Sequence, residues 1–560
     1  MRAPAKAVRP KPRVTINAPF PAPVGGWIAN RSKATPRAQG TPPGALVLEN
    51  WFPTSTGVKL RRGTQRYATV GVGEDPVFSL FTYHVGTQEQ LFAATMTTIY
   101  DISTIANAFP IEIGDGNGDS IGANDPDEVI GTPADGGDVM LTGHTNGSWV
   151  VAPMTTDGGN FIRGVNGFDL PFTYDGAAFS TTAFPLTFEA GEQAEPEDLS
   201  FVWQYKRRHF FIRRGSLDAY YLPVNSIGGE LAVLPLGAVF TLGGSLLFGA
   251  SWSLGSSSAG GLGAQCIFVT TEGEVAVYQG DNPDSVDGWS LVGVYRIGKP
   301  LGKEAFIRAG GDIIIATTVG FLPLSSAVKL DAAALAPGAV SSPIEDAWTE
   351  AVQRRSSGDW QCITWPDQTM VFVSPPSEND QPIFVANANT GAWCKFTGWM
   401  PRCWAVWRGR LFYGGDGGQV VECNVTGSDQ GVSYTGRYMG LFDDLGAPAA
   451  RKIAKFARPS MQSTVAISPS VSVVFDWNQN FPPAPNAEPA QADNVWDSAI
   501  WDNARWDSEA LSVSYERWVS VGGSGARIAP VVQITSGTQI PVDAELIAVE
   551  VTYSTGDIVT

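Results

Sequence analysis

The chain repeats one pattern of hydrophobic and polar positions: a short apolar run, a polar or glycine-rich turn, and a second apolar run. Such a pair of runs predicts a β-hairpin. The examples, in chain order, are LFAATMTTIYDI from Leu91, FIRGVNGFDLPFTYD from Phe161, FFIRRGSLDAYYLPV from Phe210, IFVTTEGEVAVYQG from Ile267, IIIATTVGFLPLS from Ile313 and LFYGGDGGQVVECN from Leu411. PIFVANANTGAWCKF, from Pro382, is a seventh candidate, which we interpret as the partner hairpin of the last repeat.

The spacing of these hairpins predicts the architecture. Successive hairpins begin 46 or more residues apart, which is the length of a four-stranded propeller blade. A lone hairpin is only marginally stable in water, whereas blades closed into a ring bury their faces. We therefore predict a mainly β fold with a β-propeller, preferably of six blades, over residues 46–430. A stacked β-sandwich is the alternative.

One helix is predicted within this body, over residues 341–355 (SSPIEDAWTEAVQRR). Ser342 is the expected N-cap, Pro343 the first helical residue, and Glu345 would complete a capping box. Trp348 and Val352 follow Ile344 at four-residue steps and predict an apolar stripe. The helix is expected to insert between two blades; a contact with a neighbouring subunit is the alternative.

The pattern changes after residue 430. The segments VSVVFDWNQNFPPAP and AELIAVEVTYS predict strands, so residues 431–560 should form a second antiparallel β domain, a sandwich or a small barrel. This domain contains three Trp-Asp pairs at five-residue steps, which begin at Trp496, Trp501 and Trp506. That step is far too short for WD repeats. We interpret the segment as a chain of tight turns whose tryptophans pack or contact another subunit; sugar binding is the alternative.

Charge is distributed unevenly along the 560 residues. Residues 1–73 contain twelve Lys or Arg and one acid, a net charge of +11, whereas the whole chain has a net charge of −18. Residues 1–45 have nine prolines and no acid, which predicts an extended basic arm. A basic arm on an acidic body is typical of docking to an acidic partner or to nucleic acid, although a solvated tail is the simpler alternative. The predicted docking residues are Arg9, Lys11, Arg13, Lys59, Arg61 and Arg62, together with the three tryptophans.

The remaining composition gives no cofactor, metal or catalytic site. The five cysteines form no C-x-x-C pair and are expected to be buried thiols, and the three histidines are far apart in the sequence. No apolar run is long enough for a transmembrane helix. DGNGDS at residues 115–120 fails the EF-hand pattern at its sixth and twelfth positions, and GGDGG at residues 414–418 predicts a turn rather than a phosphate loop. We expect no enzyme, although a pair of carboxylates at glycosidase spacing stays open.

Several longer phrases together resemble one family. PAPVGGWIANRS, LENWFPTSTGVKLRRG, TTEGEVAVYQGDNP, WSLVGVYRIGKPLG, GGDIIIATT and the tandem Trp-Asp segment are similar to the tail nozzle (tail tubular protein B) proteins of short-tailed, podovirus-like bacteriophages. The resemblance extends from about residue 20 to the C-terminus and is spread over many phrases, whereas the first 20 residues match nothing in the family.

The resemblance implies a structural virion protein with no catalytic residues and no cofactor. Six copies would form a ring below the head-tail adaptor, near the attachment sites of fibres or a tip protein. This ring would continue the DNA conduit, retain the genome and let it pass at ejection, after assembly in the host cytoplasm and without insertion into a membrane. The DNA would pass through the lumen without specific binding. The alternatives are a receptor-binding or glycan-processing propeller on the virion, and a cytoplasmic scaffold propeller.

Overall fold

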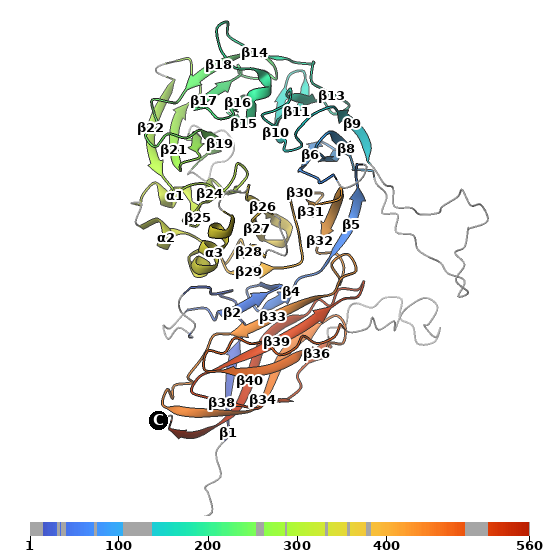
Figure 1. The fold of residues 1–560 in the computed structure, drawn as a ribbon, viewed down its shortest axis with the longest axis vertical. Coiled ribbons are helices and arrows are strands. Elements are labelled where there is room, and N and C mark those ends of the chain that lie inside the picture. Colours follow the sequence, from blue (N-terminus) through green and yellow to red (C-terminus); the bar gives the residue numbers. More distant parts are fainter. Residues whose placement is uncertain are drawn as a thin grey trace, which may run out of the picture. The chain divides into compact units, whose positions relative to one another are not determined.

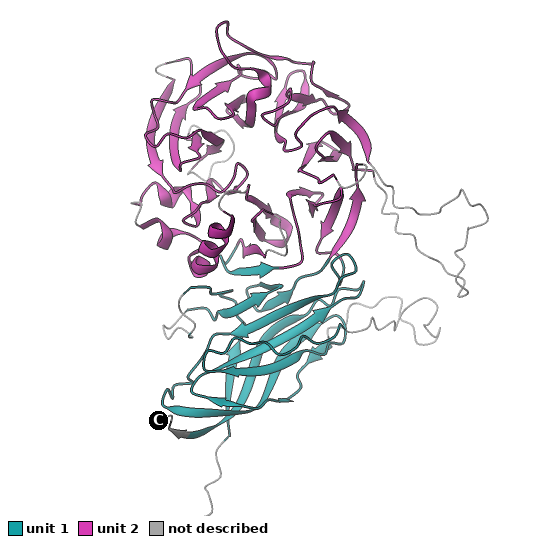
Figure 2. Cartoon of the chain, viewed as in Figure 1, with its two compact units in different colours: residues 1–63, 389–396, 426–560 teal, residues 64–388, 397–425 magenta. Residues whose placement is uncertain are grey.

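The chain folds into two compact units. Unit 1 comprises residues 1–63, 389–396 and 426–560, and unit 2 comprises residues 64–388 and 397–425 (Figure 1, Figure 2). The computed structural model describes the chain apart from residues 1–14, 31–33, 35–40, 72–74, 105–136, 254–262, 286–287, 331–333, 356–358, 377–381, 488–512 and 559–560.

Unit 2 is a β-propeller, which confirms the predicted fold class. Within its described residues, six sheets lie wholly in the unit, and strands β26–β28 add one further antiparallel module. Figure 1 shows these modules arranged in a ring.

The modules follow one another along the chain. The first four are β6 (Ser79–Val85), β7 (Gln88–Ala94), β8 (Thr98–Asp101) and β9 (Asp138–Thr142); β10 (Val150–Thr156), β11 (Gly159–Val165), β12 (Phe172–Tyr174) and β13 (Phe179–Ser180); β14 (Leu186–Phe188), β15 (Leu199–Tyr205), β16 (Arg208–Arg213), β17 (Asp218–Tyr221) and β18 (Gly229–Pro235); and β19 (Leu246–Trp252), β20 (Gln265–Thr270), β21 (Glu274–Gly280) and β22 (Trp289–Arg296). The others are β23 (Phe306–Ala309), β24 (Asp312–Ala316) and β25 (Phe321–Pro323); β26 (Gln361–Trp365), β27 (Met370–Ser374) and β28 (Ile383–Asn387); and β30 (Cys403–Trp407), β31 (Arg410–Gly414), β32 (Gln419–Cys423) and β5 (Thr64–Thr69).

Each predicted hairpin supplies strands to its own module. The candidate at Pro382 is the exception to our interpretation, because it does not complete the last repeat. Its first strand, β28, pairs with β27 from Met370↔Asn387 to Val373↔Phe384. The last sheet is completed instead by β5, a strand from the start of the propeller sequence.

This pairing of β5 with β32 closes the ring. Thr64 lies opposite Cys423 and Thr69 opposite Gln419, so the first and last strands of the unit share one antiparallel ladder. Gly418 directly before β32 has a φ of +69°, and a Cβ at this position would lie 2.0 Å from the Val70 carbonyl oxygen. The turn in GGDGG therefore needs glycine there for a backbone reason.

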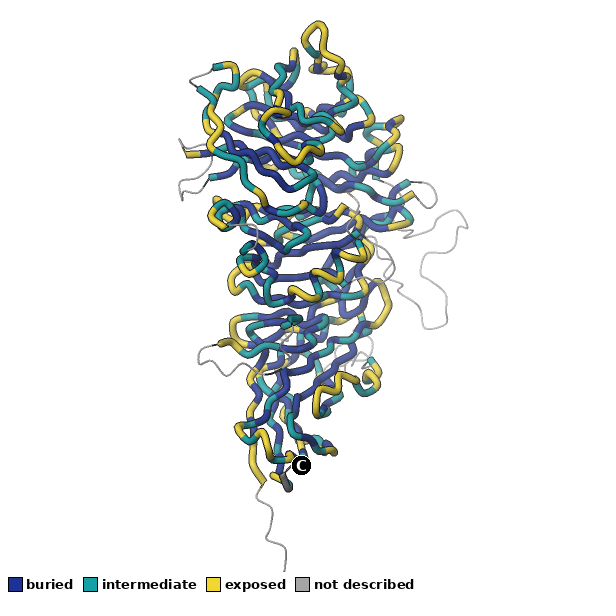
Figure 3. Tube along the Cα trace, turned by 60° about the vertical axis from the view of Figure 1, so that its left-hand side comes forward, coloured by how far each residue is buried: buried dark blue, intermediate teal, exposed yellow. Residues whose placement is uncertain are grey.

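Aromatic side chains pack the faces between modules. Between the first two sheets, the buried rings Phe81, Phe92, Phe172 and Tyr174 contact one another with centroids 5.0–5.8 Å apart. Buried positions follow the strands, and exposed positions gather in the connecting loops (Figure 3). The core of the unit is therefore a series of apolar layers between neighbouring sheets.

The predicted helix forms, but its start differs from the expectation. A 3-10 turn, Ser342–Ile344, precedes α3 (Glu345–Arg355), and Ser342 is no N-cap. The residue before it, Ser341, makes no side-chain capping bond to the helix. Its hydroxyl instead accepts a hydrogen bond from the Phe321 backbone N–H of β25 at 2.9 Å. Two short helices, α1 (Leu324–Ala327) and α2 (Leu335–Gly338), precede it, with further 3-10 turns at Pro196–Asp198 and Pro366–Gln368.

The predicted apolar stripe of α3 is buried. The Trp348 ring contacts Phe321 of β25 at 6.3 Å and Phe384 of β28 at 5.6 Å, measured between ring centroids. The helix thus packs between two neighbouring modules, as predicted.

Unit 1 is a mainly antiparallel β-sandwich, in agreement with the predicted second β domain; β2 and β29 are a parallel pair. One sheet contains β3 (Trp51–Pro53), β4 (Val58–Leu60), β40 (Glu545–Ile558), β34 (Ala450–Ser463) and β36 (Val513–Tyr515), with β1 (Thr15–Pro21) beside β40 and β37 (Val519–Ser520) and β38 (Ser524–Gly525) beside β34. The other contains β29 (Trp393–Phe396), β2 (Ala45–Glu49), β33 (Tyr434–Gly440), β39 (Ile528–Ser536) and β35 (Ser470–Phe475). Every residue of β39 is buried, so this strand is central to the core.

The boundaries of the units differ from the predicted ones at residues 45 and 430. Residues 46–63 form β2–β4 of unit 1, because β4 pairs with β40, almost 490 residues later (Val58↔Leu546). The arm also contains β1, which pairs with β40 from Thr15↔Ser554 to Pro21↔Ala548. Such long-range pairing has no signal in the local pattern of either segment.

Closure of the ring by β5 makes a prediction about stability. Ala68 is buried opposite Val420, so Ala68→Asp would place an unpaired carboxylate in the apolar layer. We expect the free energy of unfolding to fall by about 3 kcal/mol or more, measured by urea titration with tryptophan fluorescence. Arg66→Asp, on the exposed face of the same strand, should change it by about 0.5 kcal/mol or less. Equal losses in the two variants would contradict a closing role for this strand.

Candidate functional site

One edge strand of each propeller module faces the centre of the ring, and among these inner strands are β10, β15, β19, β23, β26 and β30. Neighbouring inner strands pack on one another, as β10 does on β15 and β15 on β19. The rings of Phe248 in β19 and Phe306 in β23 stack with centroids 4.5 Å apart and an interplanar angle of 11°. The inner strands therefore surround a central channel, in which side chains from several modules meet.

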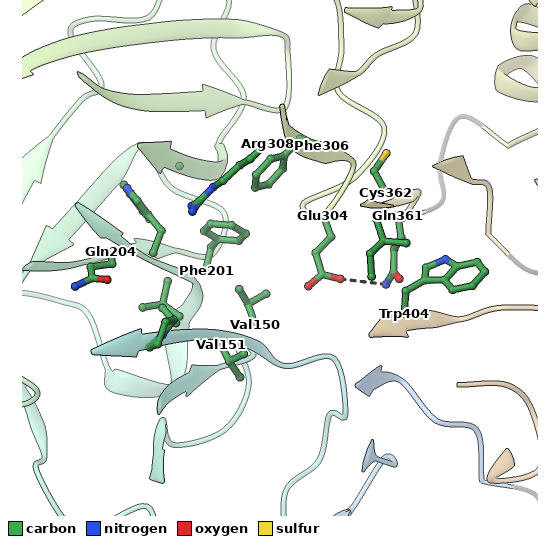
Figure 4. Close-up of a pocket in the computed structure, with 16 residues that line it drawn as sticks. Val150, Val151, Phe201, Gln204, Glu304, Phe306, Arg308, Gln361, Cys362 and Trp404 are labelled. Atoms are coloured by element: carbon green, nitrogen blue, oxygen red, sulfur yellow. Dashed lines mark hydrogen bonds between the residues drawn. The ribbon is translucent and has the colours of Figure 1, made fainter. Parts of the chain in front are cut away.

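A cavity of about 400 Å³ occupies this channel (Figure 4). Its lining comes from β10, β15, β19, β23, β26 and β30 and from Glu304 just before β23. A volume of this size lies within the range of small-molecule sites, which are mostly apolar with a few polar groups. Phe201, Phe306 and Trp404 supply much of the apolar surface, and Glu304, Arg308 and Gln204 are among the polar groups.

Glu304, Phe306 and Arg308 line the cavity from one stretch of chain. They stand at alternate positions, and alternate residues of a strand project to the same side. Figure 4 shows the Glu304 and Arg308 side chains reaching into the cavity, with Phe306 beside Arg308. One short segment, EAFIR, therefore places an acid, an aromatic ring and a base along the channel wall.

The Glu304 carboxyl group is held by Gln361. The Gln361 Nε2 group donates a hydrogen bond to Glu304 Oε2 at 3.1 Å. Burial raises the pKa of Glu304, the neighbouring Lys303 acts in the opposite direction, and Asp359 raises it further. Lys303 is itself held in place, since its Nζ donates to the Ser148 carbonyl at 3.0 Å, and burial lowers its pKa.

The Arg308 guanidinium has no such partner. Within the described residues it makes no hydrogen bond and no ion pair, and burial lowers its pKa. Its side chain is exposed to the channel rather than packed into a layer. The cavity thus contains one cationic group whose charge is not balanced by direct contact.

The lining lacks the usual parts of a catalytic site. Cys362 lines the cavity, but burial raises the pKa of its thiol, so it stays protonated and is a poor nucleophile at neutral pH. Glu304 is the one carboxylate among the lining residues, whereas glycosidases use a pair. Over the described part of the chain, no group of three His, Cys, Asp or Glu side chains could hold a metal ion.

The predicted docking residues differ in exposure and in their ion pairs, and several lie outside the described residues. Lys59 is exposed on β4, and Arg62 is partly exposed and paired with Asp543 at 2.6 Å between Nε and Oδ1. The other positions lie outside the described residues, namely Arg9, Lys11, Arg13, Trp496, Trp501 and Trp506. The acidic segment at residues 115–120 also lies outside them.

Arg61 is a correction to the docking prediction. Its guanidinium is buried and bidentate to Asp429, with Nη1–Oδ1 at 2.9 Å and Nη2–Oδ2 at 2.6 Å. Its Nε donates to Asn50 Oδ1 at 2.8 Å, and the Tyr434 ring lies 4.0 Å from its Cζ. Because each charged contact is made within unit 1, this arginine stabilises the sandwich and is not available to a neighbouring subunit.

The channel residues were missed from the sequence, although a signal existed. The alternation of acid, aromatic residue and base in EAFIR is unusual for a strand of a mostly apolar body. However, alternation alone does not identify which face of a strand lines a channel. That assignment requires the order of the strands within each sheet.

Comparisons with known proteins identify no family. No protein-family model matches the sequence, and no curated protein matches it either. Solved structures with a similar fold include the Cps50 (Swd1) β-propeller domain of Myceliophteria thermophila, at 12% identity over 65% of this chain and 100% of that chain, with a TM-score of 0.36. They also include the computationally designed Ika8 protein (10% identity, 64% and 100%, TM-score 0.31) and YCF48 from Cyanidioschyzon merolae (9%, 65% and 98%, TM-score 0.28).

The histidines do not form a metal site, but one of them predicts a dependence of stability on pH. Burial lowers the pKa of His209 from 6.5 to about 4. Between these values the unfolded chain binds a proton that the folded chain does not. Stability is therefore fully present above pH 6.5 and is lost as the pH falls toward 4, by about 3 kcal/mol.

The test compares the free energy of unfolding at pH 7 and pH 4.5 by urea titration. His209→Gln should remove most of this component, so its difference between the two pH values is smaller than that of the parent chain. His84→Gln, at an exposed histidine paired with Glu89, should retain the full difference. The same pH difference in all three proteins would rule out His209 as the source.

Proposed function

We propose that the chain is a structural virion protein, the tail nozzle subunit of a short-tailed bacteriophage. Six copies form a ring that continues the DNA conduit below the head-tail adaptor, retains the genome and lets it pass at ejection. The observation that most supports this function is where the family-like phrases lie in the fold. Four of the six phrases coincide with framework strands of the two units rather than with one site.

Four phrases illustrate this point. LENWFPTSTGVKLRRG contains the end of β2 and all of β3 and β4 of the sandwich, and WSLVGVYRIGKPLG begins with β22 of the propeller. TTEGEVAVYQGDNP contains β21, and GGDIIIATT contains β24. Similarity that follows the framework favours a shared architecture, and hence a role in assembly, over a shared reaction.

The charge of the chain is compatible with a conduit. Each copy has a net charge of −18, so a ring of six has six times that charge. A wall rich in Lys and Arg would bind DNA phosphates through release of counterions, whereas a negative wall repels them. DNA can therefore slide through the lumen without specific binding.

The basic segment supplies the docking surface for the adaptor. Arg9, Lys11 and Arg13 lie in the first 14 residues, and Lys59 and Arg62 are at least partly exposed. Arg61 is not part of this surface because Asp429 neutralises it. The other partners are a tail fibre or tip protein and the copies of the chain itself.

The channel chemistry argues against the glycan-processing alternative. Its lining provides one carboxylate, and the thiol there is protonated. Among the described residues no helix is both long and apolar enough to cross a membrane. A receptor-binding role depends on the Trp-Asp segment at residues 495–508, which lies outside the described residues.

Ring formation is the direct test of the proposed function. We expect particles of six times the 59.5 kDa chain mass, with sixfold symmetry and a central lumen, in electron micrographs of the purified chain or of virions that contain it. Antibody against the chain should label the tail below the adaptor. Trimers, or labelling confined to fibre tips, would instead support a receptor-binding protein.

Docking through the basic segment gives a second prediction. Deletion of residues 1–14 and the substitution Lys59→Glu should each weaken binding to the adaptor by roughly tenfold, and more at low salt, because exposed charges are screened by ions. Binding is measured by surface plasmon resonance at two salt concentrations. Deletion of the whole arm to residue 45 is unsuitable, since it removes β1 from its sheet.

Lys329→Glu provides the matched control, because Lys329 is an exposed lysine of unit 2. It should leave adaptor binding unchanged. If the truncated chain, Lys59→Glu and the control bind equally well, the basic segment does not dock to the adaptor.

A further inference from the structure

The central channel of the propeller contains an arginine without a counter-ion. Arg308 projects into the cavity of about 400 Å³ and makes no ion pair or hydrogen bond among the described residues (Figure 4). Arg410, by contrast, is paired with the carboxylate of Glu422. The Arg308 side chain is exposed to the channel, so its charge is open to an anionic group that can accept charge-assisted hydrogen bonds from it.

The charge balance limits the class of anion. One guanidinium neutralises one negative charge, and its planar fork fits the two oxygens of a carboxylate. The lining has no second cation to balance a second anionic group, since its other ionisable side chain of this kind is the carboxylate of Glu304. A monocarboxylate therefore fits the channel better than a phosphate dianion or a dicarboxylate.

The rest of the lining offers hydrogen bonds to hydroxyl groups. Gln361 donates its hydrogen bond to Glu304 Oε2. The other oxygen, Oε1, has no hydrogen-bond partner within the described residues. The Gln204 amide lies on the same wall as Phe201, and its one described side-chain contact is a weak one, from Nε2 to Met154 Sδ at 3.6 Å. The Glu304 carboxylate and the Gln204 amide lie apart from the Arg308 guanidinium, so they can bind the hydroxyl groups of a ligand whose anionic group contacts Arg308.

The apolar part of the lining is firmly positioned. Phe306 stacks on the buried ring of Phe248, and Phe248 also contacts Phe201 at 6.2 Å between centroids. Aromatic faces of this kind pack against the C–H groups of a carbon chain while the polar groups fix its orientation. The wall is thus formed before any ligand binds.

We propose that the propeller channel is a binding site for a small hydroxylated monocarboxylate, with its carboxylate on Arg308 and its hydroxyl groups on Glu304, Gln361 and Gln204. The site lies within one copy of the chain. It is therefore independent of ring assembly, and its test does not depend on the proposed conduit function.

The experiment is isothermal titration calorimetry of the full chain with gluconate as the probe. Gluconate should bind, acetate should bind more weakly because it lacks hydroxyl groups, and glycerol should not bind because it lacks the charge. Arg308→Gln should lower the affinity for gluconate at least tenfold. Arg308→Lys, which retains the charge but loses the planar fork, should recover part of it.

Arg207→Gln is the matched control, since Arg207 is exposed and makes no ion pair among the described residues. It should bind gluconate as the parent chain does. Near-ultraviolet circular dichroism verifies that each variant is folded.

Three results would overturn the proposal. The first is absence of gluconate binding to the parent chain. The second is equal affinity of the parent chain and a folded Arg308→Gln. The third is tighter binding of inorganic phosphate than of gluconate, which would assign the site to a different anion.

Discussion

The pairing of β5 with β32 is the constraint on which the propeller depends. Each sheet buries its faces only against its neighbours, so an open series of modules would leave two apolar faces in water. The ladder from Thr64↔Cys423 to Thr69↔Gln419 makes the first strand of the unit a member of its last sheet. Hydrogen bonds between the first and last strands of the propeller unit thereby fix the ring, and the ring in turn defines the channel.

The same pairing explains how one unit is inserted into the other. The chain first enters the propeller at Thr64 and finally leaves it after Val425, with residues 389–396 assigned to unit 1 in between. The ladder of β5 and β32 brings the first and last of these points together. On the unit 1 side, the Gly63 N–H donates to the Thr426 carbonyl at 2.5 Å. Ends that lie close together are what allows one domain to be inserted into another without disturbing either fold.

Local patterns in the sequence were sufficient for the fold class but not for the boundaries. The alternation of apolar runs and turns from Leu91 to Leu411 identified hairpins that the structure contains, because a hairpin is a local structure. The assignment of residues 46–63 failed because Val58 pairs with Leu546, a partner that no local pattern identifies. The capping box failed because Ser342, the predicted N-cap, is the first residue of a 3-10 turn that precedes the helix.

The same distinction applies to function. Arg61 belongs to a basic cluster in the sequence, and only the fold reveals that Asp429, 368 residues later, neutralises it. Conversely, Arg308 is inconspicuous in the sequence, and only ring closure places it in a channel without a counter-ion. Whether a charged side chain is available to a partner therefore depends on long-range pairing, which the composition of the sequence does not reveal.

A channel within each propeller and a lumen through a ring of six are physically separate proposals. A cavity of about 400 Å³ is too small for duplex DNA, whose major groove alone is about 12 Å wide. The genome would pass through a space formed by several copies, where the negative charge of the chain limits adhesion. A small monoanion would meet Arg308 in the channel of each copy. Each copy can therefore hold its own ligand while the ring of six leaves a passage for DNA.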